Sequence, residues 1–308
     1  MALKGIASIG ECMLELSGGA EKNWRMGFAG DTFNTLWAVR ALTSPDRPCD
    51  YVSAFGDDPF SKDQIAFFQA AGIGIANSPK IAGARPGLYA ITLTGAERSF
   101  TYWRSDAAAR QLASDPAELA KSLENRAFVY FSGITLAILA PAARVTLLNA
   151  IDQARKGGGL IAFDPNYRPR LWPEPAAARA AIDEALRVAH IALPTFLDER
   201  DLYGDADQAE TAARLQLAGV SEIIVKNGDL PAFVAFGESS EMVEGVTVET
   251  PVDTTGAGDS FNGAYLAARL TGSQPVEAAR RAHKVAAAVV QVRGALAPFE
   301  NVKAAFEN

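Results

Sequence analysis

The stretch that most constrains the fold reads Asp253-Thr254-Thr255-Gly256-Ala257-Gly258-Asp259. Residues 260–270 follow directly, and their apolar spacing predicts an amphipathic helix. Small residues with free backbone N–H groups therefore open a helix whose N-terminus carries partial positive charge, which suits a phosphate. A carboxylate on the same turn would repel such a ligand unless it took part in the reaction. We therefore expect Asp259 to accept a proton from a hydroxyl group that attacks the phosphate.

Simpler interpretations exist, because Gly-Ala-Gly often forms only a tight turn and an aspartate often caps a helix. A dinucleotide fingerprint is disfavoured, since Phe261 stands where its third glycine should be, and the absence of Gly-Lys-Ser/Thr excludes a P-loop. The longer string resembles, nearly residue for residue, the C-terminal signature of the ribokinase-like (PfkB-type) carbohydrate kinases. That resemblance makes Asp259 the catalytic base. It also implies that the amides of Gly256, Ala257 and Gly258 form an anion hole for the ATP phosphates.

The composition is that of an ordinary globular protein, with 308 residues of which 49% are hydrophobic and 21% are charged. A chain of this length can bury a large core. The net charge is −7 and the pI is about 5.1, which argues against nucleic acid or an anionic membrane as the main partner. The apolar run at the start is interrupted by Lys4 and is too short for a signal peptide or a membrane span. We therefore expect a cytoplasmic protein.

The cysteines and histidines are too few to form a metal or disulfide framework. Cys12 and Cys49 are the two cysteines, and we expect them to be buried, unpaired thiols in a reducing compartment. His190 and His283 are the two histidines, which argues against a histidine-based metal site or catalytic triad. We expect both to have structural roles.

Short apolar runs alternate with helical patterns along most of the chain. This alternation predicts βαβ units and an α/β fold with a doubly wound, mostly parallel sheet, helices on both faces and ligands at the carboxyl ends of the strands. We expect one domain over residues 1–308. The expected strands are 6–10, 51–55, 128–132, 160–164, 191–194 and 223–226, and the expected helices include 32–42, 61–71, 141–156, 175–189 and 209–218.

Two segments break this alternation and have the pattern of hairpins. Residues 88–93 and 98–103 are joined by the turn 94–97, and residues 13–16 and 24–28 by the turn 17–20. We expect a small antiparallel sheet formed by two insertions, at about 13–28 and 86–104. In the ribokinase-like family such a β-lid closes on the sugar, and family members often dimerise through it. The resemblance therefore implies a homo-oligomer.

The N-terminal family signature, Gly-Gly-Asp/Ala-x-x-Asn, is matched by Ala29-Gly30-Asp31-Thr32-Phe33-Asn34, with Ala29 in place of the first glycine. Gly30 permits a close approach of the backbone to a ligand. Asp31 and Asn34 can then bind sugar hydroxyls, although Asp31 could instead only cap the helix.

Two further stretches narrow the substrate, Tyr102-Trp103-Arg104-Ser105-Asp106-Ala107-Ala108-Ala109-Arg110 and Asp164-Pro165-Asn166-Tyr167-Arg168-Pro169-Arg170-Leu171-Trp172. Arginine suits a carboxylate, which it can bind through two hydrogen bonds, and a neutral sugar needs no such cation. Both stretches resemble those of 2-keto-3-deoxygluconate kinases. The resemblance assigns the substrate carboxylate to Tyr102 and Arg104, the substrate and phosphate region to Arg168, and the sugar site to Tyr89. Surface ion pairs are the alternative for these arginines; Arg110 and Arg170 stay unassigned, and Trp172 is expected to pack.

The nucleotide side matches the family less completely. Val225-Lys226-Asn227-Gly228-Asp229-Leu230-Pro231-Ala232 resembles the Lys-x-Gly-x-x-Gly turn that lines the ATP site, which implies that Lys226, Asn227 and Gly228 bind ATP. Pro231 replaces the last glycine, and its fixed φ could alter this turn. The family's Asn-x-x-Glu, which positions Mg²⁺, has no clean match. Asp198 or Glu199 could serve instead, because Mg²⁺ keeps much of its water shell. The resemblance leaves open a requirement for a monovalent cation such as K⁺.

The expected function is ATP- and Mg²⁺-dependent phosphorylation of 2-keto-3-deoxygluconate at its terminal (6-) hydroxyl. A kinase of the same fold that acts on fructose, ribose or a nucleoside is the nearest alternative. A non-catalytic sugar or nucleotide sensor on the same scaffold is an alternative from another class, which the intact Asp259 disfavours.

Overall fold

The computed structural model describes residues 4–18, 23–94 and 97–307, and within them it has two sheets. The main sheet has eight strands in the order β12-β11-β10-β9-β8-β7-β1-β4, and the smaller has four in the order β3-β2-β5-β6. The main strands are β1 (Gly5–Ile9), β4 (Cys49–Val52), β7 (Arg126–Ser132), β8 (Leu160–Asp164), β9 (Ile191–Ala192), β10 (Glu222–Asn227), β11 (Leu230–Phe236) and β12 (Ser239–Val243). The smaller sheet, called the lid below, contains β2 (Met13–Gly18), β3 (Trp24–Ala29), β5 (Leu88–Thr94) and β6 (Glu97–Trp103).

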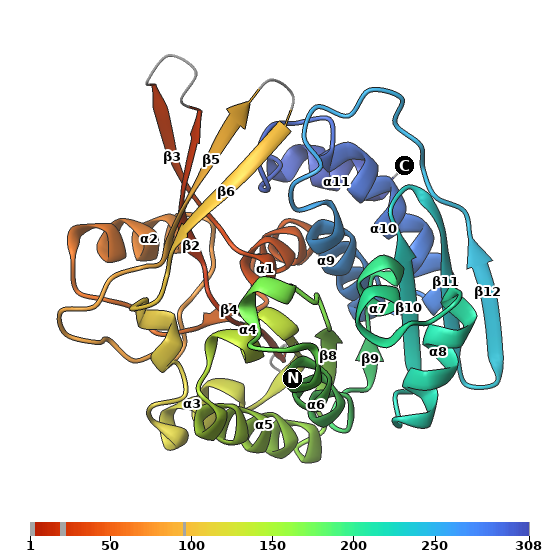
Figure 1. The fold of residues 1–308 in the computed structure, drawn as a ribbon, viewed down its shortest axis with the longest axis horizontal. Coiled ribbons are helices and arrows are strands. Elements are labelled where there is room, and N and C mark those ends of the chain that lie inside the picture. Colours follow the sequence, from red (N-terminus) through yellow and green to blue (C-terminus); the bar gives the residue numbers. More distant parts are fainter. Residues whose placement is uncertain (1–3, 19–22, 95–96, 308) are drawn as a thin grey trace.

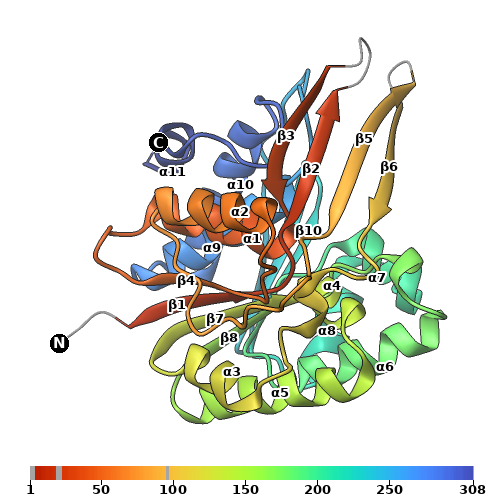
Figure 2. The same cartoon turned by 90° about the vertical axis from the view of Figure 1, so that its left-hand side faces the viewer.

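Helices cover both faces of the main sheet, so the predicted doubly wound α/β fold is confirmed (Figures 1 and 2). The six neighbouring strands β4, β1, β7, β8, β9 and β10 are parallel, and β11 and β12 add an antiparallel edge. The α-helices are α1 (Asp31–Leu42), α2 (Pro59–Ala70), α3 (Pro116–Leu123), α4 (Gly133–Ile138), α5 (Pro141–Lys156), α6 (Pro175–Leu186), α7 (Phe196–Tyr203), α8 (Gln208–Leu217), α9 (Ala257–Leu270), α10 (Pro275–Val289) and α11 (Phe299–Glu307). Short 3₁₀ turns occupy Ala108–Gln111 and Pro169–Leu171.

Alternate residues of each central strand enter two separate cores. Val129 and Phe131 of β7 pack with α3, α5, α6 and α8, whereas Phe128 and Tyr130 pack with α1, α9 and α10. Figure 2 shows these two groups of helices on opposite sides of the sheet. This two-sided burial explains why the strands read as continuous apolar runs.

The lid stands on one side of the molecule (Figure 1), and its strand β3 contacts α2, where the rings of Phe28 and Phe67 have centroids 5.3 Å apart. Its two antiparallel hairpins, β2–β3 and β5–β6, come from segments far apart in the sequence. A parallel pairing joins them, with Leu14 opposite Leu88 and Ser17 opposite Ile91. One continuous sheet therefore carries side chains from both segments on the same face.

Some predicted boundaries differ from the observed elements. The strand expected at 51–55 ends at Val52, since Ser53 donates its N–H to the side chain of Ser78 rather than to a strand. The strand expected at 191–194 contains only two residues, and Pro194 has no N–H to continue a ladder. The hairpin β11–β12 was not among the expected strands, because β12 is an exposed polar edge without a clear alternation.

The cysteines and histidines lie where structural roles predict them. Cys12 and Cys49 are free and buried. The Nδ1 atom of His190 accepts a hydrogen bond from the Ile161 N–H at 3.0 Å. His283 is buried, with its ring edge-on to Phe261. Across the described ranges, no helix combines the length and apolar character needed to cross a membrane.

Helices α1 and α9 pack closely because α9 has a glycine at the contact. A Cβ atom on Gly263 would overlap the Thr35 carbonyl oxygen and lie 2.7 Å from the Ala38 Cβ atom. Neither obstacle is the movable end of a long side chain. The two helices can therefore approach at this distance only with glycine at position 263.

We expect Gly263→Ala to lower the free energy of unfolding by about 1–3 kcal/mol, the usual range for overpacking a core. Alanine's better helix propensity, about 1 kcal/mol, opposes this loss without cancelling it. Urea unfolding would measure the change. Gly27→Ala is the control, because no atom lies within 4 Å of a Cβ at that position. A variant at position 263 as stable as the parent protein would contradict this account of the contact.

Candidate active site

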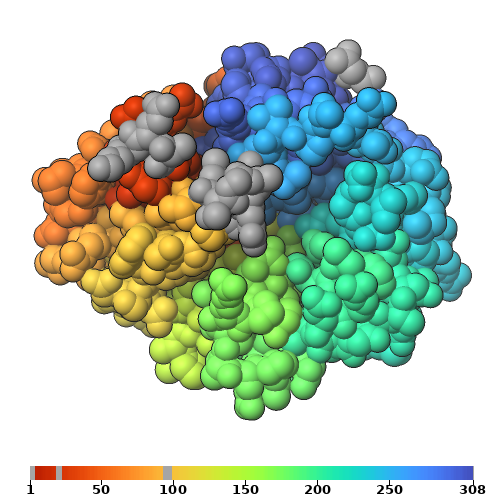
Figure 3. All heavy atoms as spheres, turned by 45° about the horizontal axis from the view of Figure 1, so that its top comes forward, coloured from red at the N-terminus to blue at the C-terminus, as the bar shows by residue number. Residues whose placement is uncertain are grey.

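The predicted site residues converge at the carboxyl ends of β8 and β10, where the N-termini of α1 and α9 also meet. Asp164 ends β8 and Lys226 lies near the end of β10. Asp31 begins α1, and Asp259 lies in the first turn of α9. Figure 3 views the molecule from the lid side, with the red to yellow N-terminal part facing the blue C-terminal part. Segments from both halves of the chain thus contribute to one site.

The turn before α9 is built for the close approach of an anion. Gly256 caps the helix with φ 74°, a left-handed conformation that favours glycine, and a Cβ there would lie 2.8 Å from the Ala295 carbonyl oxygen. Asp253 fixes the turn by accepting hydrogen bonds from the N–H groups of Thr255, at 2.9 Å, and Gly294, at 3.0 Å. Gly258 is exposed, so its backbone is open to a ligand.

Asp259 is held by a residue of the other predicted signature. The Asn34 amide donates to Asp259 Oδ2 at 2.8 Å, and the Asn34 Oδ1 atom accepts from the Gly30 N–H at 3.3 Å. Gly30 cannot carry a side chain, since a Cβ would overlap the Glu11 carbonyl oxygen. The N-terminal signature and the C-terminal signature are therefore joined directly through Asn34.

The surroundings of Asp259 raise its pKa to about 7 from an ordinary value of 3.8. Loss of hydration is the largest cause, and repulsion from Asp31 is next; Asp164 adds to the rise, whereas the Asn34 hydrogen bond and Lys226 oppose it. A carboxylate with a pKa near neutral pH is matched to accepting a proton from a hydroxyl group. Asp259 thus has the electrostatic character expected of a general base.

Asn166 is a site residue that the sequence analysis did not single out. Its amide donates to Asp31 Oδ2 at 2.8 Å, and its N–H donates to Asp164 Oδ1 at 3.0 Å. Its φ is 36°, in the left-handed region that asparagine tolerates better than most residues. Its place directly after a buried strand was the available signal, because strand ends carry ligand-binding side chains in such folds.

Arg104 meets a carboxylate that belongs to the protein itself. Its guanidinium donates to Glu11, and the two side chains are 12% and 1% exposed. Within the described residues, Glu11 Oε1 and Arg104 Nε have no hydrogen-bond partner. Burial raises the pKa of Glu11, and Arg104 opposes that rise. The pairing of Glu11 with Arg104 could not be predicted from the sequence, since the two residues lie 93 positions apart.

One face of the lid presents aromatic and acidic side chains. The register places Gly27, Glu15, Tyr89 and Tyr102 side by side across the four strands. Tyr89 is buried and donates its hydroxyl hydrogen to Glu15, whereas Tyr102 is 49% exposed. The two tyrosine rings have centroids 5.8 Å apart. The structure thus brings the predicted Tyr89 and Tyr102 together and adds Glu15.

Asp198 and Glu199, the two candidates for positioning Mg²⁺, face different surroundings. Asp198 is paired with Arg168 at 3.0 Å, and these side chains are 22% and 49% exposed. Glu199 is 1% exposed and accepts from Arg214 at 2.7 Å. Arg168 also feels the charges of Asp164 and Asp259, and its pKa is raised chiefly by Asp198 against the opposing effect of burial. Of the two candidates for positioning Mg²⁺, Asp198 is therefore the one that lies next to the site residues.

The predicted nucleotide turn divides into two parts. Asn227 ends β10 opposite Leu230, and Gly228 and Asp229 form the turn to β11, where Gly228 has φ 64°. Pro231 lies within β11, and its carbonyl oxygen accepts from Gln208 at 3.0 Å, so the hairpin accommodates proline. Lys226 is turned inward instead, with its ammonium 2.9 Å from Asp164. Lys226 thus lies beneath the Gly256–Gly258 turn rather than in the hairpin loop.

Arg110, Arg170 and Trp172 lie outside these contacts. Arg110 is exposed, although its charge reaches Glu11. Arg170 belongs to the short turn after β8. Trp172 is buried beneath Arg144, whose guanidinium lies 4.9 Å from the ring centroid, which agrees with the predicted packing role.

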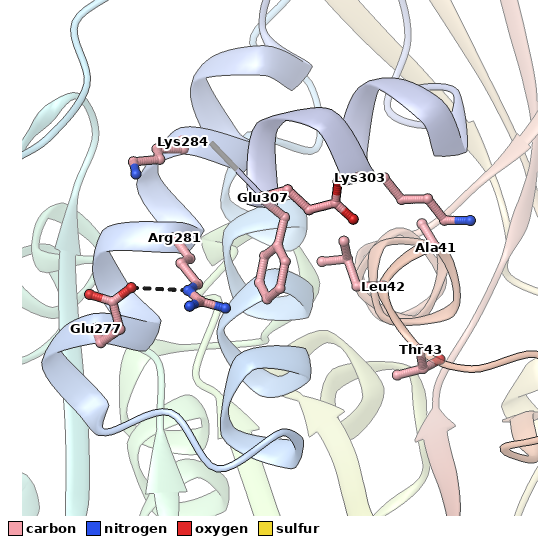
Figure 4. Close-up of a pocket in the computed structure, with 9 residues that line it drawn as sticks. Ala41, Leu42, Thr43, Glu277, Arg281, Lys284, Lys303 and Glu307 are labelled. Atoms are coloured by element: carbon pink, nitrogen blue, oxygen red, sulfur yellow. Dashed lines mark hydrogen bonds and ion pairs between the residues drawn. The ribbon is translucent and has the colours of Figure 1, made fainter.

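A cavity of about 630 Å³ lies elsewhere, at the opposite end of α1 (Figure 4). It is lined by residues from the end of α1 and from α10 and α11, namely Ala41, Leu42, Thr43, Glu277, Arg281, Lys284, Lys303, Phe306 and Glu307. Asp31 begins this helix and Leu42 ends it, which separates the cavity from the site by the length of α1, about 18 Å for 12 residues. None of the predicted site residues lines it.

The raised pKa of Asp259 predicts a pH-dependent stability. The folded state binds this proton more tightly than the unfolded chain, so the contribution of Asp259 falls as pH rises from about 4 to about 7 and is constant above. Asp259→Asn removes this titration, and asparagine can still accept from Asn34. We expect the Tm of the variant, relative to that of the parent protein, to increase as the pH rises from about 4 to about 7 and to be highest above pH 7. Asp46→Asn, in an exposed loop, should show no such growth; an equal response of both variants would contradict the prediction.

Comparison with known proteins adds close full-length relatives. A model of the pfkB family of carbohydrate kinases matches residues 3–302. The 2-dehydro-3-deoxygluconokinase of Dickeya dadantii is 41% identical over 312 residues, covering 99% of this chain and 100% of that protein. The 2-dehydro-3-deoxygluconokinase of Escherichia coli K12 is 40% identical over 309 residues, covering 98% and 99%.

A solved structure supports the same fold. The putative ribokinase II from E. coli in complex with ATP and Mg²⁺ superimposes with a TM-score of 0.84 at 24% identity, covering 99% of both chains. The family model spans nearly the whole chain, and the relatives match it from end to end. The chain therefore belongs to the pfkB family of carbohydrate kinases.

Proposed function

We propose that this protein transfers the γ-phosphoryl group of ATP to the terminal (6-) hydroxyl of 2-keto-3-deoxygluconate. One observation carries the proposal: a carboxylate whose pKa is raised to about 7 lies on the same helical turn as an open glycine turn that can receive phosphate. The name shared by the relatives that are about 40% identical over the full chain supports this substrate.

In this reaction Asp259 accepts the proton of the attacking hydroxyl. Asn34 orients the carboxylate, and Asp31 with Asn166 offers acceptors and donors to neighbouring sugar hydroxyls. The N–H groups of Gly256, Ala257 and Gly258 stabilise charge on the transferring phosphoryl group. The lid carries Tyr89 and Tyr102 over the sugar and excludes water, which would otherwise replace the sugar as acceptor.

Of the two arginines proposed to bind the substrate, Arg104 at the carboxylate and Arg168 at the substrate and phosphate region, Arg168 is the more available. Its side chain is half exposed, and one guanidinium nitrogen donates to Asp198. Arg104 is nearly buried against Glu11, so it would have to share or exchange its partner to hold the substrate. Arg168 is therefore the residue we expect to discriminate most strongly between a keto acid and a neutral sugar.

The site fits ATP and Mg²⁺ in different degrees. The open turn at Gly258 and the N-terminus of α9 suit the phosphates, and Asn227 and Gly228 are the residues proposed for the rest of the nucleotide. Asp198 offers a carboxylate for Mg²⁺, which needs few protein oxygens. Bound Mg²⁺ would supply neutralisation of phosphate charge. A K⁺ requirement, assembly of a homo-oligomer through the lid and a cytoplasmic location are further parts of this proposal.

Replacing the proposed base should greatly lower the rate of phosphoryl transfer and leave the protein folded. We expect Asp259→Asn to lower kcat by about 10²–10⁴-fold, the usual contribution of a general base. Substrate binding should change much less, since asparagine keeps the hydrogen bond to Asn34. A coupled assay of ADP release, with a thermal unfolding scan of the same preparation, checks both statements. Near-native turnover in a folded variant would refute the role of Asp259.

A substrate panel separates the proposal from its nearest alternative. We expect ADP release with 2-keto-3-deoxygluconate and little with fructose, ribose or adenosine. Arg168→Gln should raise the KM for the keto acid and reduce the ratio of activity on the keto acid to activity on neutral sugars, because it removes a cation that a neutral sugar does not need. Activity on fructose alone would identify a fructokinase. Saturable sugar binding without any ADP release would identify a sensor.

A further inference from the structure

Four buried polar side chains lie directly beneath the phosphate-binding turn, and we call Tyr130, Asp164, Lys226 and Asn262 the buried quartet. The Lys226 ammonium donates to Asp164 Oδ2 and to Asn262 Oδ1, both at 2.9 Å. The Asn262 amide donates to Asp164 Oδ2 at 2.7 Å and to the Tyr130 hydroxyl at 3.1 Å. The members come from β7, β8, β10 and α9, so the quartet ties three strands to one helix.

The quartet excludes water almost completely. Its members are between 0% and 6% exposed. A lysine–aspartate pair at such depth loses more hydration energy than a surface pair and contributes little to stability by itself. Four donor–acceptor contacts satisfy the polar atoms, yet an apolar cluster of the same size would fill this space as well. Packing alone therefore does not explain why the ion pair is there.

The position of the ion pair relative to the reaction gives a reason. Asn262 lies one helical turn after Asp259 on α9, so it anchors the turn that carries the proposed base. The Lys226 ammonium lies 3.8 Å from the point where a Cβ on Gly258 would sit. The charge of Lys226 is thus next to both the phosphate-binding amides and Asp259.

The charges that face Asp259 come from several elements. Asp31 of α1 and Asp164 of β8 disfavour its ionised form, whereas Lys226 of β10 favours it. The Tyr130 hydroxyl of β7 and the Arg168 guanidinium that follows β8 also lie within electrostatic reach. Two carboxylates therefore disfavour the ionised form of Asp259, and the buried ammonium of Lys226 offsets part of their effect.

We propose that Asp164 and Lys226 act as a positioning pair for phosphoryl transfer, which holds the first turn of α9 through Asn262 and balances the charge around Asp259. This inference rests on the proposed role of Asp259 as the base. Neither residue of the pair touches the nucleotide in this role. Removing one charge should shift the ionisation of Asp259 in one direction, removing the other should shift it in the opposite direction, and removing both should restore the balance.

The test compares Lys226→Met, Asp164→Asn and the double variant by ¹³C NMR titration of labelled aspartate carboxyl groups, with Asp259→Asn to assign the signal. We expect the midpoint of Asp259 to rise in Lys226→Met and to fall in Asp164→Asn, each by about one pH unit, a tenfold change in the ionisation equilibrium. The double variant should titrate close to the parent protein. This readout needs no turnover, so it stands even if the proposed substrate is wrong.

The acidic limb of the kcat profile should move in the same directions in an active enzyme. Asp50→Asn is the control, because it removes one partner of the partly buried Arg126–Asp50 pair, 2.5 Å apart at the amino end of the strands; both readouts should stay at the parent value. Equal midpoints in all folded variants, or shifts of Lys226→Met and Asp164→Asn in the same direction, would overturn the inference. If Lys226→Met does not fold, a double variant that titrates like Asp164→Asn would overturn it as well.

Discussion

The contact between α1 and α9 is the constraint on which the site depends. Both helices begin at the carboxyl edge of the sheet, and each carries one half of the proposed chemistry: the proposed sugar-binding groups on α1, and the proposed base with its glycine turn on α9. Gly263 lets the two backbones approach until Asn34 reaches Asp259 at 2.8 Å. A wider spacing would leave both signatures intact in the sequence and would separate the proposed sugar-binding residues from the proposed base.

Crowding of like charges follows from this convergence. Asp31, Asp164 and Asp259 come from three elements and share a region with little water. Asparagines separate them, with Asn34 bound to Asp259 and Asn166 bound to Asp31. Each amide supplies a donor without adding charge; the Asn34 donor lowers the pKa of Asp259, but the value stays raised because burial and the neighbouring carboxylates outweigh this hydrogen bond. The raised pKa of Asp259 is therefore a property of the whole arrangement rather than of one neighbour.

The sequence alone predicted the fold class and the residues whose chemistry is local. The turn at Gly256–Gly258 and the helix after it could be predicted, because glycine freedom and helix capping act within a few residues. The partners of Glu11, Glu15 and Asn166 could not be predicted, since they depend on how distant segments pair. The Asn34–Asp259 contact spans 225 positions. The inward turn of Lys226 also needed the structure, because a residue near the end of a strand can face either a loop or the core.

The pairing of β2 with β5 has a consequence for how the active molecule forms. Residues 14–17 and 88–91 must meet as parallel neighbours, and the chain between them returns through α1, β4 and α2. Such a non-local pairing closes a long loop, which costs chain entropy. The pairing of β1 with β7, Ile6 with Phe128, closes a longer loop still, so all four lid strands leave the ribosome before the main sheet can gain β7 beside β1. The buried cluster at the lid has five residues, far fewer than the two main cores, so we expect hydrogen exchange under mild denaturing conditions to begin in the lid while the main cores are still intact.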